Sequence, residues 1–138
     1  MTRTIRTALL ALAAAAPLAQ AADLTIRIDN VQAGEGQLMV ALYDGAATYL
    51  KRPARSVNVA AHAGSTTLVI PDLAPGGYAL AVYHDVNGNG RMDANPMGIP
   101  LEPIAFGNDA QGHMGPPAFD AATLALPAAG FVTRVTLR

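Results

Sequence analysis

The sequence predicts an all-β protein, an antiparallel β-sandwich of about seven strands, and three observations support this prediction. Short apolar segments with the two-residue period of a strand recur along the chain. Clusters of Gly, Pro and Asn separate these segments at the spacing of turns. After the first 21 residues no segment carries a convincing helical period, so a sandwich is favoured over folds that pack helices on a sheet.

The first 21 residues have the features of a secretory signal peptide in the expected order. Arg3 and Arg6 precede an apolar run, and Ala19-Gln20-Ala21 places small residues where a signal peptidase cuts. The run is shorter than the roughly 20 residues that span a bilayer, and the sequence has no cysteine that could carry a lipid. We expect cleavage after Ala21, no transmembrane anchor afterwards, a single domain over residues 22–138, and a periplasmic or secreted location. The alternatives are an uncleaved anchor and a buried helix.

The charge of the expected mature domain argues against a nucleic-acid partner. Without Arg3 and Arg6 the chain has seven basic and ten acidic residues, a formal charge of −3. A mildly acidic domain without a basic run is not typical of nucleic-acid binding. Because the chain has no cysteine, disulfides cannot stabilise it, and a bound ion would be another way to fix a long loop.

Each expected strand carries its own pattern. The first alternates apolar and polar residues, as a half-buried strand does, and the second is apolar on both faces, as a central strand is. The clearest is 77–85, where Leu80 and Val82 face one way and Ala79 and Ala81 the other. The stretch 45–56 breaks the pattern and has room for a helical turn before Pro53. In order, the expected strands are 23–29, 36–44, 56–61, 65–73, 77–85, 122–127 and 131–138.

The turn before the strand 77–85 predicts a tyrosine corner. Pro75, Gly76 and Gly77 stand directly before Tyr78. A tyrosine there can donate its hydroxyl to the upstream backbone, as in other sandwich domains. The stretch resembles the corresponding corner of prealbumin-like and related bacterial surface sandwiches. An ordinary loop with a core tyrosine is the alternative.

Residues 86–117 form a connection far longer than the usual 4 to 6 residues. Gly, Pro, Asn and Asp are dense in it, and little periodicity remains. It keeps enough large apolar residues to pack on the domain, so we expect an ordered loop. Loops of this length are usually functional or bound to something.

This loop begins with "HDVNGNGRMD", a pattern that predicts a cation site. Oxygen-bearing side chains recur at every second position, Gly90 permits a sharp turn, and Arg91 offers its backbone carbonyl. Calcium takes 6 to 8 oxygen ligands, and such spacing lets a short loop supply them. Magnesium demands a more rigid octahedron, and zinc prefers nitrogen or sulfur. The expected ligands of Ca²⁺ are Asp85, Asn87, Asn89, Arg91 and Asp93, with Glu102 as a sixth.

Glu102 enters this set because the EF-hand pattern is incomplete. Pro96 stands where an EF-hand has a bidentate Glu, and a strand rather than a helix leads into the loop. Glu102 is the nearest carboxylate that can replace it, whereas Asp109 and Asp120 are less constrained candidates. With so few carboxylates, a weak site of roughly 10⁻⁴ to 10⁻³ M is expected. The alternative is a metal-free turn whose Asx side chains bind local N–H groups.

An enzyme or small-ligand binder centred on His84, Asp85 and Glu102 is a second hypothesis. The chain has no cysteine, and its only serines after residue 21, Ser56 and Ser65, lie in no recognisable nucleophile motif. No catalytic residue is therefore assigned. His84 shares the core side of its strand with Val82, which favours a structural role, and it is kept as a candidate binding residue.

The second half of the chain resembles the DUF2141 family of exported bacterial proteins without an established activity. The shared pieces are a Gly-Tyr-Ala strand, H-D-x-N-x-N-G-x-x-D at 84–93, G-I-P-x-E at 98–102, a G-F-S-N-like stretch at 105–108 and G-P-P-x-F at 115–119. Ala105 and Gly107 replace the usual Gly and Ser beside Phe106. The resemblance implies an exported sandwich domain with the long loop as its distinctive surface.

Taken together, these features predict an exported, non-enzymatic β-sandwich module whose long loop is organised by Ca²⁺. Its role would be binding or structural at the cell envelope, with an unknown envelope or extracellular partner. A metal-free scaffold is the third hypothesis.

Overall fold

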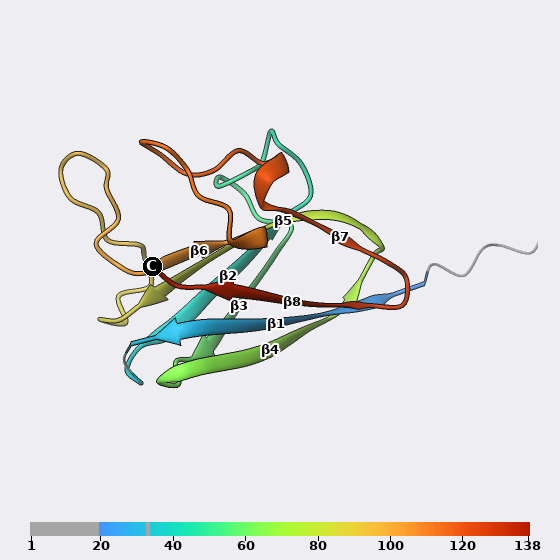
Figure 1. Ribbon diagram of the computed structural model, residues 1–138, viewed down its shortest axis with the longest axis horizontal. Coiled ribbons are helices and arrows are strands. Elements are labelled where there is room, and N and C mark those ends of the chain that lie inside the picture. Colours follow the sequence, from blue (N-terminus) through green and yellow to red (C-terminus); the bar gives the residue numbers. More distant parts are fainter. Residues whose placement is uncertain (1–19, 33) are drawn as a thin grey trace, which may run out of the picture.

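The computed structural model describes residues 20–32 and 34–138, so nearly all of the expected signal peptide lies outside the described residues. Eight strands form two sheets that pack face to face, as Figure 1 shows. In the described part of the chain no helix has the length and apolar character needed to cross a membrane.

The smaller sheet has three strands in the order β4-β1-β8. The central strand, β1 (Ala22–Val31), pairs antiparallel with β4 (Gly64–Leu73) and parallel with β8 (Phe131–Thr136). The alternating pattern of β1 correctly predicts its buried face, because Leu24, Ile26 and Ile28 are fully buried. The parallel pairing with β8 joins the two ends of the domain.

The larger sheet has the order β3-β2-β5-β6, and β7 also pairs with β5. All of its ladders are antiparallel. The apolar segment 36–44, predicted to be a central strand, indeed has a paired strand on each side. The strands of this sheet are β2 (Gln37–Tyr43), β3 (Arg55–Ala60), β5 (Gly76–Asp85), β6 (Ile104–Phe106) and β7 (Thr123–Leu126).

The main core lies between the sheets. It combines Leu24, Ile26 and Ile28 of β1 with inward-facing residues of the larger sheet such as Leu80 and Val82. A second, smaller cluster lies on the other face of the larger sheet. There Tyr49 packs edge to face against Tyr43 and Phe119, with ring centroids 5.4 and 5.7 Å apart. The 3₁₀ helix η2 (Asp120–Ala122) contributes Ala122 to this cluster.

The predicted sandwich is confirmed, and each of the seven expected strands is present. The tyrosine corner is confirmed as well, because the Tyr78 hydroxyl donates to the Ala74 carbonyl over 2.8 Å. Two features differ from the prediction in detail. The three-residue strand β6 and the 3₁₀ helix η1 (Gly107–Asp109) interrupt the expected loop 86–117. The pairing of β1 with β8 is parallel in an otherwise antiparallel fold.

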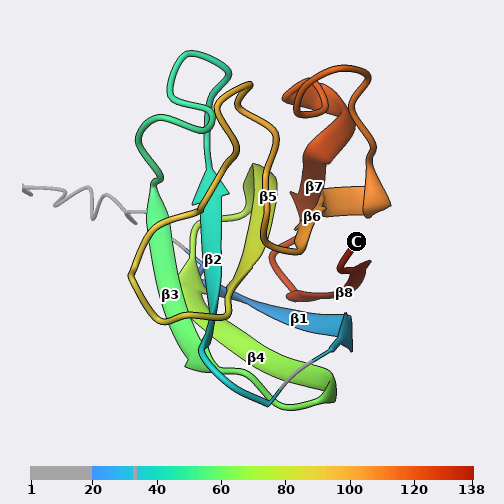
Figure 2. The same ribbon diagram turned by 90° about the vertical axis from the view of Figure 1, so that its left-hand side faces the viewer.

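The segment 86–103 runs from β5 to β6 by a wide excursion. Figure 2 shows it crossing β3 and β2 on the side that faces the viewer and then returning to β6. Within it, Ala94 and Pro100 form an isolated antiparallel bridge, and Asn95 Oδ1 accepts the N–H groups of Met97 and Ile99 over 2.9 and 3.0 Å. The segment is therefore an ordered element placed over the larger sheet.

Candidate functional site: the 85–93 loop and the groove beside it

Asp85 organises the loop from its buried first position. It is the last residue of β5 and is fully buried. Its Oδ1 accepts the N–H of Asn89 over 3.1 Å, and its Oδ2 accepts the N–H of Gly90 over 2.8 Å. Gly90 has a φ of +78°, in the left-handed region that glycine adopts without strain. The carboxylate therefore curls the chain around itself.

The next two oxygen-bearing residues repeat this inward arrangement. Asn87 Oδ1 accepts the N–H of Asn89 over 3.1 Å, and Asn89 Oδ1 accepts the N–H of Arg91 over 3.0 Å. These are consecutive Asx turns, each spanning two residues. The two-residue spacing seen in the sequence thus produces a run of side-chain oxygens directed at the loop's own backbone.

Asp93 closes the loop opposite the two amides. Asn87 Nδ2 donates to Asp93 Oδ2 over 2.6 Å, and Asn89 Nδ2 lies 3.0 and 2.9 Å from its two oxygens. The hydrogen bonds from Asn87 and Asn89 hold the pKa of Asp93 below its ordinary value. Desolvation raises the pKa by less than these bonds lower it, and the nearby Arg91 charge lowers it slightly further. The carboxylate is thus held in its ionised form.

Glu102 joins the two ends of the loop. Its Oε1 accepts the N–H of Val86 and its Oε2 accepts the N–H of Asp93, each over 3.1 Å. The side chain is buried. The neighbouring Leu101 N–H also donates to the Asp93 carbonyl over 2.8 Å. The sequence analysis selected Glu102 as the sixth ligand of the ion, and in the structure its carboxylate reaches the loop through backbone hydrogen bonds.

The structure thus brings Asp85, Asn87, Asn89, Asp93 and Glu102 into one hydrogen-bonded unit, with Arg91 attached through its N–H. Within the described residues, no group of three or more His, Asp or Glu side chains is clustered as metal ligands. Each carboxylate is instead bonded to N–H groups. Of the two less constrained candidates, Asp109 accepts the Thr136 N–H over 2.7 Å, and Asp120 opens η2.

His84 lies beneath the loop rather than in it. The ring is fully buried, and Nε2 lies 2.7 Å from the Glu35 carbonyl oxygen. Because a carbonyl only accepts, Nε2 carries a proton, and Nδ1 is buried without a hydrogen-bond partner among the described residues. The His84 N–H donates to the Pro103 carbonyl over 2.9 Å. In the described structure no hydrogen bond joins His84 to Asp85 or Glu102, so these three residues do not form a relay.

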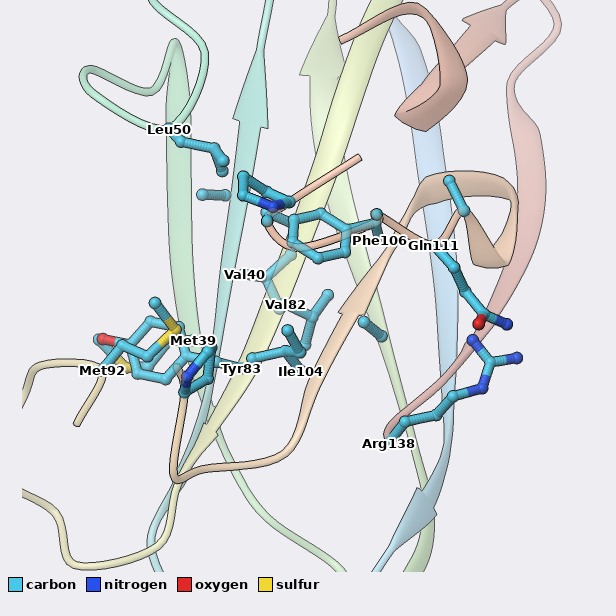
Figure 3. A pocket seen from close by; sticks show the side chains of 18 of the residues that line it. Met39, Val40, Leu50, Val82, Tyr83, Met92, Ile104, Phe106, Gln111 and Arg138 are labelled. Atoms are coloured by element: carbon cyan, nitrogen blue, oxygen red, sulfur yellow. The ribbon is translucent and has the colours of Figure 1, made fainter. Parts of the chain in front are cut away.

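A groove on the outer face of the larger sheet was missed by the reasoning from sequence. It has a volume of about 1080 Å³, near the upper end of the range for small-molecule sites. The sheet forms its floor, and the segments 92–100 and 110–116 form its sides, as the close-up in Figure 3 shows in part. One sequence signal could have found it: all four methionines after Met1 line this groove, namely Met39, Met92, Met97 and Met114.

Comparisons with known proteins identify a family for this chain. Neither the curated proteins nor the solved structures returned a match. The family described as "Uncharacterized protein conserved in bacteria (DUF2141)" matches residues 26–133, which include every strand from β2 to β7, most of β1 and half of β8. The resemblance expected from the motif of the long loop is thereby confirmed. The chain belongs to the DUF2141 family of uncharacterised bacterial proteins.

Proposed function

We propose that this protein is an exported, non-enzymatic β-sandwich module that binds Ca²⁺ in its 85–93 loop, with a binding or structural role at the cell envelope. The observation that supports the proposal is the position of Glu102, which is buried and bonded to both ends of the loop. A cation bound here would fix the turn at 85–93. Through Glu102 it would also fix the end of the segment 86–103, just before the chain enters β6.

The side chains around Asp93 supply the chemistry that the proposal needs. Asn87 and Asn89 direct their amide groups at the Asp93 carboxylate. An amide carries one oxygen and one nitrogen on the same carbon, so a half-turn of each group would direct oxygen where nitrogen now lies. Two amide oxygens, the Asp93 carboxylate and the Arg91 carbonyl are ligands of the kind that Ca²⁺ prefers. Asp85 and Glu102 would complete the set.

A metal-free scaffold is the competing hypothesis, and one observation favours it. The oxygens of Asp85 and Glu102 already accept backbone N–H groups, at distances between 2.8 and 3.1 Å. A loop satisfied in this way does not require an ion to hold its shape. The two hypotheses therefore differ in whether added Ca²⁺ changes the stability of the domain.

Thermal unfolding of residues 22–138 with EDTA and with Ca²⁺ separates them. At about 10 mM Ca²⁺, roughly 100 times a Kd of 10⁻⁴ M, binding stabilises the folded state by about 2.7 kcal/mol. For a domain of this size the melting temperature would rise by several degrees. Equal melting temperatures in EDTA and in Ca²⁺ would reject the calcium proposal.

The variant Asn87→Asp sharpens this test because the two hypotheses predict different responses of its melting temperature to Ca²⁺. Asn87 now donates to Asp93 over 2.6 Å, so a second carboxylate there repels the first and lowers the melting temperature in EDTA. With Ca²⁺, the added charge strengthens binding, and the shift between EDTA and Ca²⁺ becomes larger than in the wild type. Asn95→Asp is the matched control, since Asn95 makes its own Asx turn outside the 85–93 loop. A loss of stability in Asn87→Asp that Ca²⁺ does not reverse would support the metal-free scaffold.

A further inference from the structure

The floor of the groove is built from two rows of side chains that cross four strands. Strand pairing places Asn58, Met39, Tyr83 and Ile104 in one row, and Ser56, Ala41, Ala81 and Phe106 in the next. Ala41 and Ala81 are direct partners at the centre of the second row. Neither has a side chain beyond Cβ, so the sheet is hollowed there between bulkier neighbours. Four strands spaced by about 4.8 Å give this floor a span of roughly 14 Å.

The sides of the groove present large apolar residues to solvent. Met92, Met97 and Ile99 come from the segment between β5 and β6, and Met114 comes from the segment after η1. Their exposed fractions are 47, 80, 54 and 98%, respectively. Apolar side chains gathered around a hollow are typical of a binding surface. Methionine is flexible and polarisable, so such walls adapt to an apolar chain without one fixed shape.

One end of the groove presents a cationic side chain. Of the described residues that line the groove, Arg138 alone has a charged side chain. Its backbone is held beside β6, because the Arg138 and Ile104 N–H groups each donate to the carbonyl of the other residue over 3.0 Å. Arg138 and Gln111 both line the groove, and Figure 3 draws them on the same side of it. The ion pairs of the described structure involve Arg27 and Arg134, so the Arg138 guanidinium is free to meet an outside anion.

We propose that this groove binds a small amphiphile, an apolar chain that ends in a carboxylate, with the chain over Ala41 and Ala81 and the carboxylate on Arg138. The occupant follows from the distribution of charge. The groove is apolar over most of its length, which suits a hydrocarbon chain. Its single cation presents two parallel N–H donors, which match the two oxygens of a carboxylate.

The inference goes beyond the proposed function and stands without it. The two alanines of the floor and Arg138 lie outside the 85–93 loop, and of the four exposed residues named for the sides only Met92 belongs to that loop. Binding is therefore measured both in EDTA and in Ca²⁺. Binding in EDTA supports the groove even if the calcium proposal fails, and loss of calcium binding leaves the groove prediction unchanged.

The test is calorimetric titration of residues 22–138 with three probes below their micelle-forming concentrations: dodecanoate, dodecanol and dodecyltrimethylammonium. We expect dodecanoate to bind with a stoichiometry of one and more tightly than the other two. In Arg138→Gln its affinity falls about tenfold, because a charge-assisted hydrogen-bond pair is lost, while dodecanol binds as before. Arg134→Gln is the matched control and leaves all three affinities unchanged, since Arg134 pairs with Asp29 on the smaller sheet.

The hollow itself is tested by filling it. Ala41→Phe and Ala81→Phe each place a ring in the central trough, and both side chains point away from the main core. Each variant prevents binding of dodecanoate and of dodecanol, and circular dichroism checks that each variant remains folded, because both alanines also pack against the second cluster. Met97→Ser is a second variant, and because Met97 is 80% exposed the substitution does not disturb the sheet. It weakens the binding of dodecanoate and of dodecanol. The inference is overturned if dodecanoate does not bind, if the trimethylammonium probe binds as tightly, or if Arg138→Gln leaves the affinity for dodecanoate unchanged.

Discussion

Single side chains hold the ends of strands in this protein, and Tyr78 is the clearest case. Its ring is half-buried near the start of β5, and its hydroxyl reaches back to the Ala74 carbonyl at 2.8 Å. The bond closes the turn that joins β4 to β5. His84 works at the opposite end of the same strand, where Nε2 donates to the Glu35 carbonyl in the connection between β1 and β2.

Tyr78→Phe removes the hydroxyl and leaves the ring. Because one hydrogen bond is lost, the free energy of unfolding is expected to fall by about 0.5 to 1.5 kcal/mol. Urea unfolding followed by circular dichroism measures the change, and the slope against urea should stay the same. A variant as stable as the wild type would show that the corner does not contribute to stability.

Asp29, on the smaller sheet, makes a contribution to stability that depends on pH. The Arg27 Nε donates to Asp29 Oδ1 over 2.7 Å, and Arg134 pairs with the other oxygen. The hydrogen bond from Arg27 lowers the pKa of Asp29 below 3.8, and the two arginine charges add to this against desolvation. Because the pKa is lower in the folded state, the resulting stabilisation is complete above about pH 3.8 and is lost as the pH falls through the lowered value.

A titration followed by the NMR shift of the Asp29 carboxyl carbon tests this prediction. The wild type should titrate below 3.8, and Arg27→Ala should move the pKa upward. Arg52→Ala is a control, because Arg52 is an exposed residue in the turn before β3. An Asp29 that titrates at its ordinary value in the wild type would contradict the assignment.

At the scale of elements, the segment 86–103 is ordered by a few polar groups rather than by a core of its own. Glu102 bonds to the N–H groups of Val86 and Asp93, and Asn95 forms the turn near the far end. The connection between β1 and β2 packs against the start of this segment at Gly36. A Cβ at Gly36 would lie 2.0 Å from the Asp85 carbonyl oxygen, and the φ of Gly36 is +74°. The base of the loop is therefore packed tightly while its tip remains exposed.

Glu102→Gln changes one oxygen of this tie into an amide nitrogen. One of the two N–H groups then loses its acceptor, so we expect a loss of about 1 to 3 kcal/mol in the free energy of unfolding. Hydrogen exchange at Val86 and Asp93 locates the effect, because one of these amides should exchange faster while those of β1 do not. Glu35→Gln is the matched control, since Glu35 contributes its backbone carbonyl to His84. Unchanged exchange at both amides would show that Glu102 does not hold the loop.

The sequence predicts elements best where the periodic signal is local. The alternation in 77–85 placed Leu80 and Val82 in the core and Ala81 on the other face, as found. The strand β6 has only three residues and carries no period, since its identity comes from pairing with β5 and with Arg138. The groove was not predicted for the same reason, because it too depends on strand pairing. Ala41 and Ala81 are ordinary in sequence, and only the register of β2 with β5 makes them neighbours.

In the candidate loop, too, the local contacts could be expected from the sequence and the distant contacts could not. Local Asx turns were the alternative to a cation site, and Asn87 and Asn89 each accept an N–H two residues on, which their spacing in the sequence allows. Glu102 was selected for its carboxylate, and it does reach the loop. Its bonds to backbone N–H groups were not predicted, because they depend on the path of the chain between residues 93 and 102.

For the whole molecule, the first testable statement concerns its expected export. Signal cleavage after Ala21 would release a chain that starts at Ala22, which is the first residue of β1 and is buried against the domain. Expression of the full sequence in a bacterium, followed by mass spectrometry of the periplasmic and secreted fractions, should find residues 22–138. Recovery of the uncleaved chain from the membrane fraction would contradict this prediction.

The parallel pairing of β1 with β8 also sets the order in which the domain can fold. Residues 24–29 find their partners at 131–136, so the smaller sheet is finished only when almost the entire chain has emerged. Contacts between such distant residues make folding slow, since the loop between them must close before the pairing stabilises it. A chain shortened by its last eight residues would lose β8 and expose one edge of β1. The smaller sheet therefore stays incomplete until the end of synthesis, which would suit a chain that has to cross a membrane before it folds, as the proposed export requires.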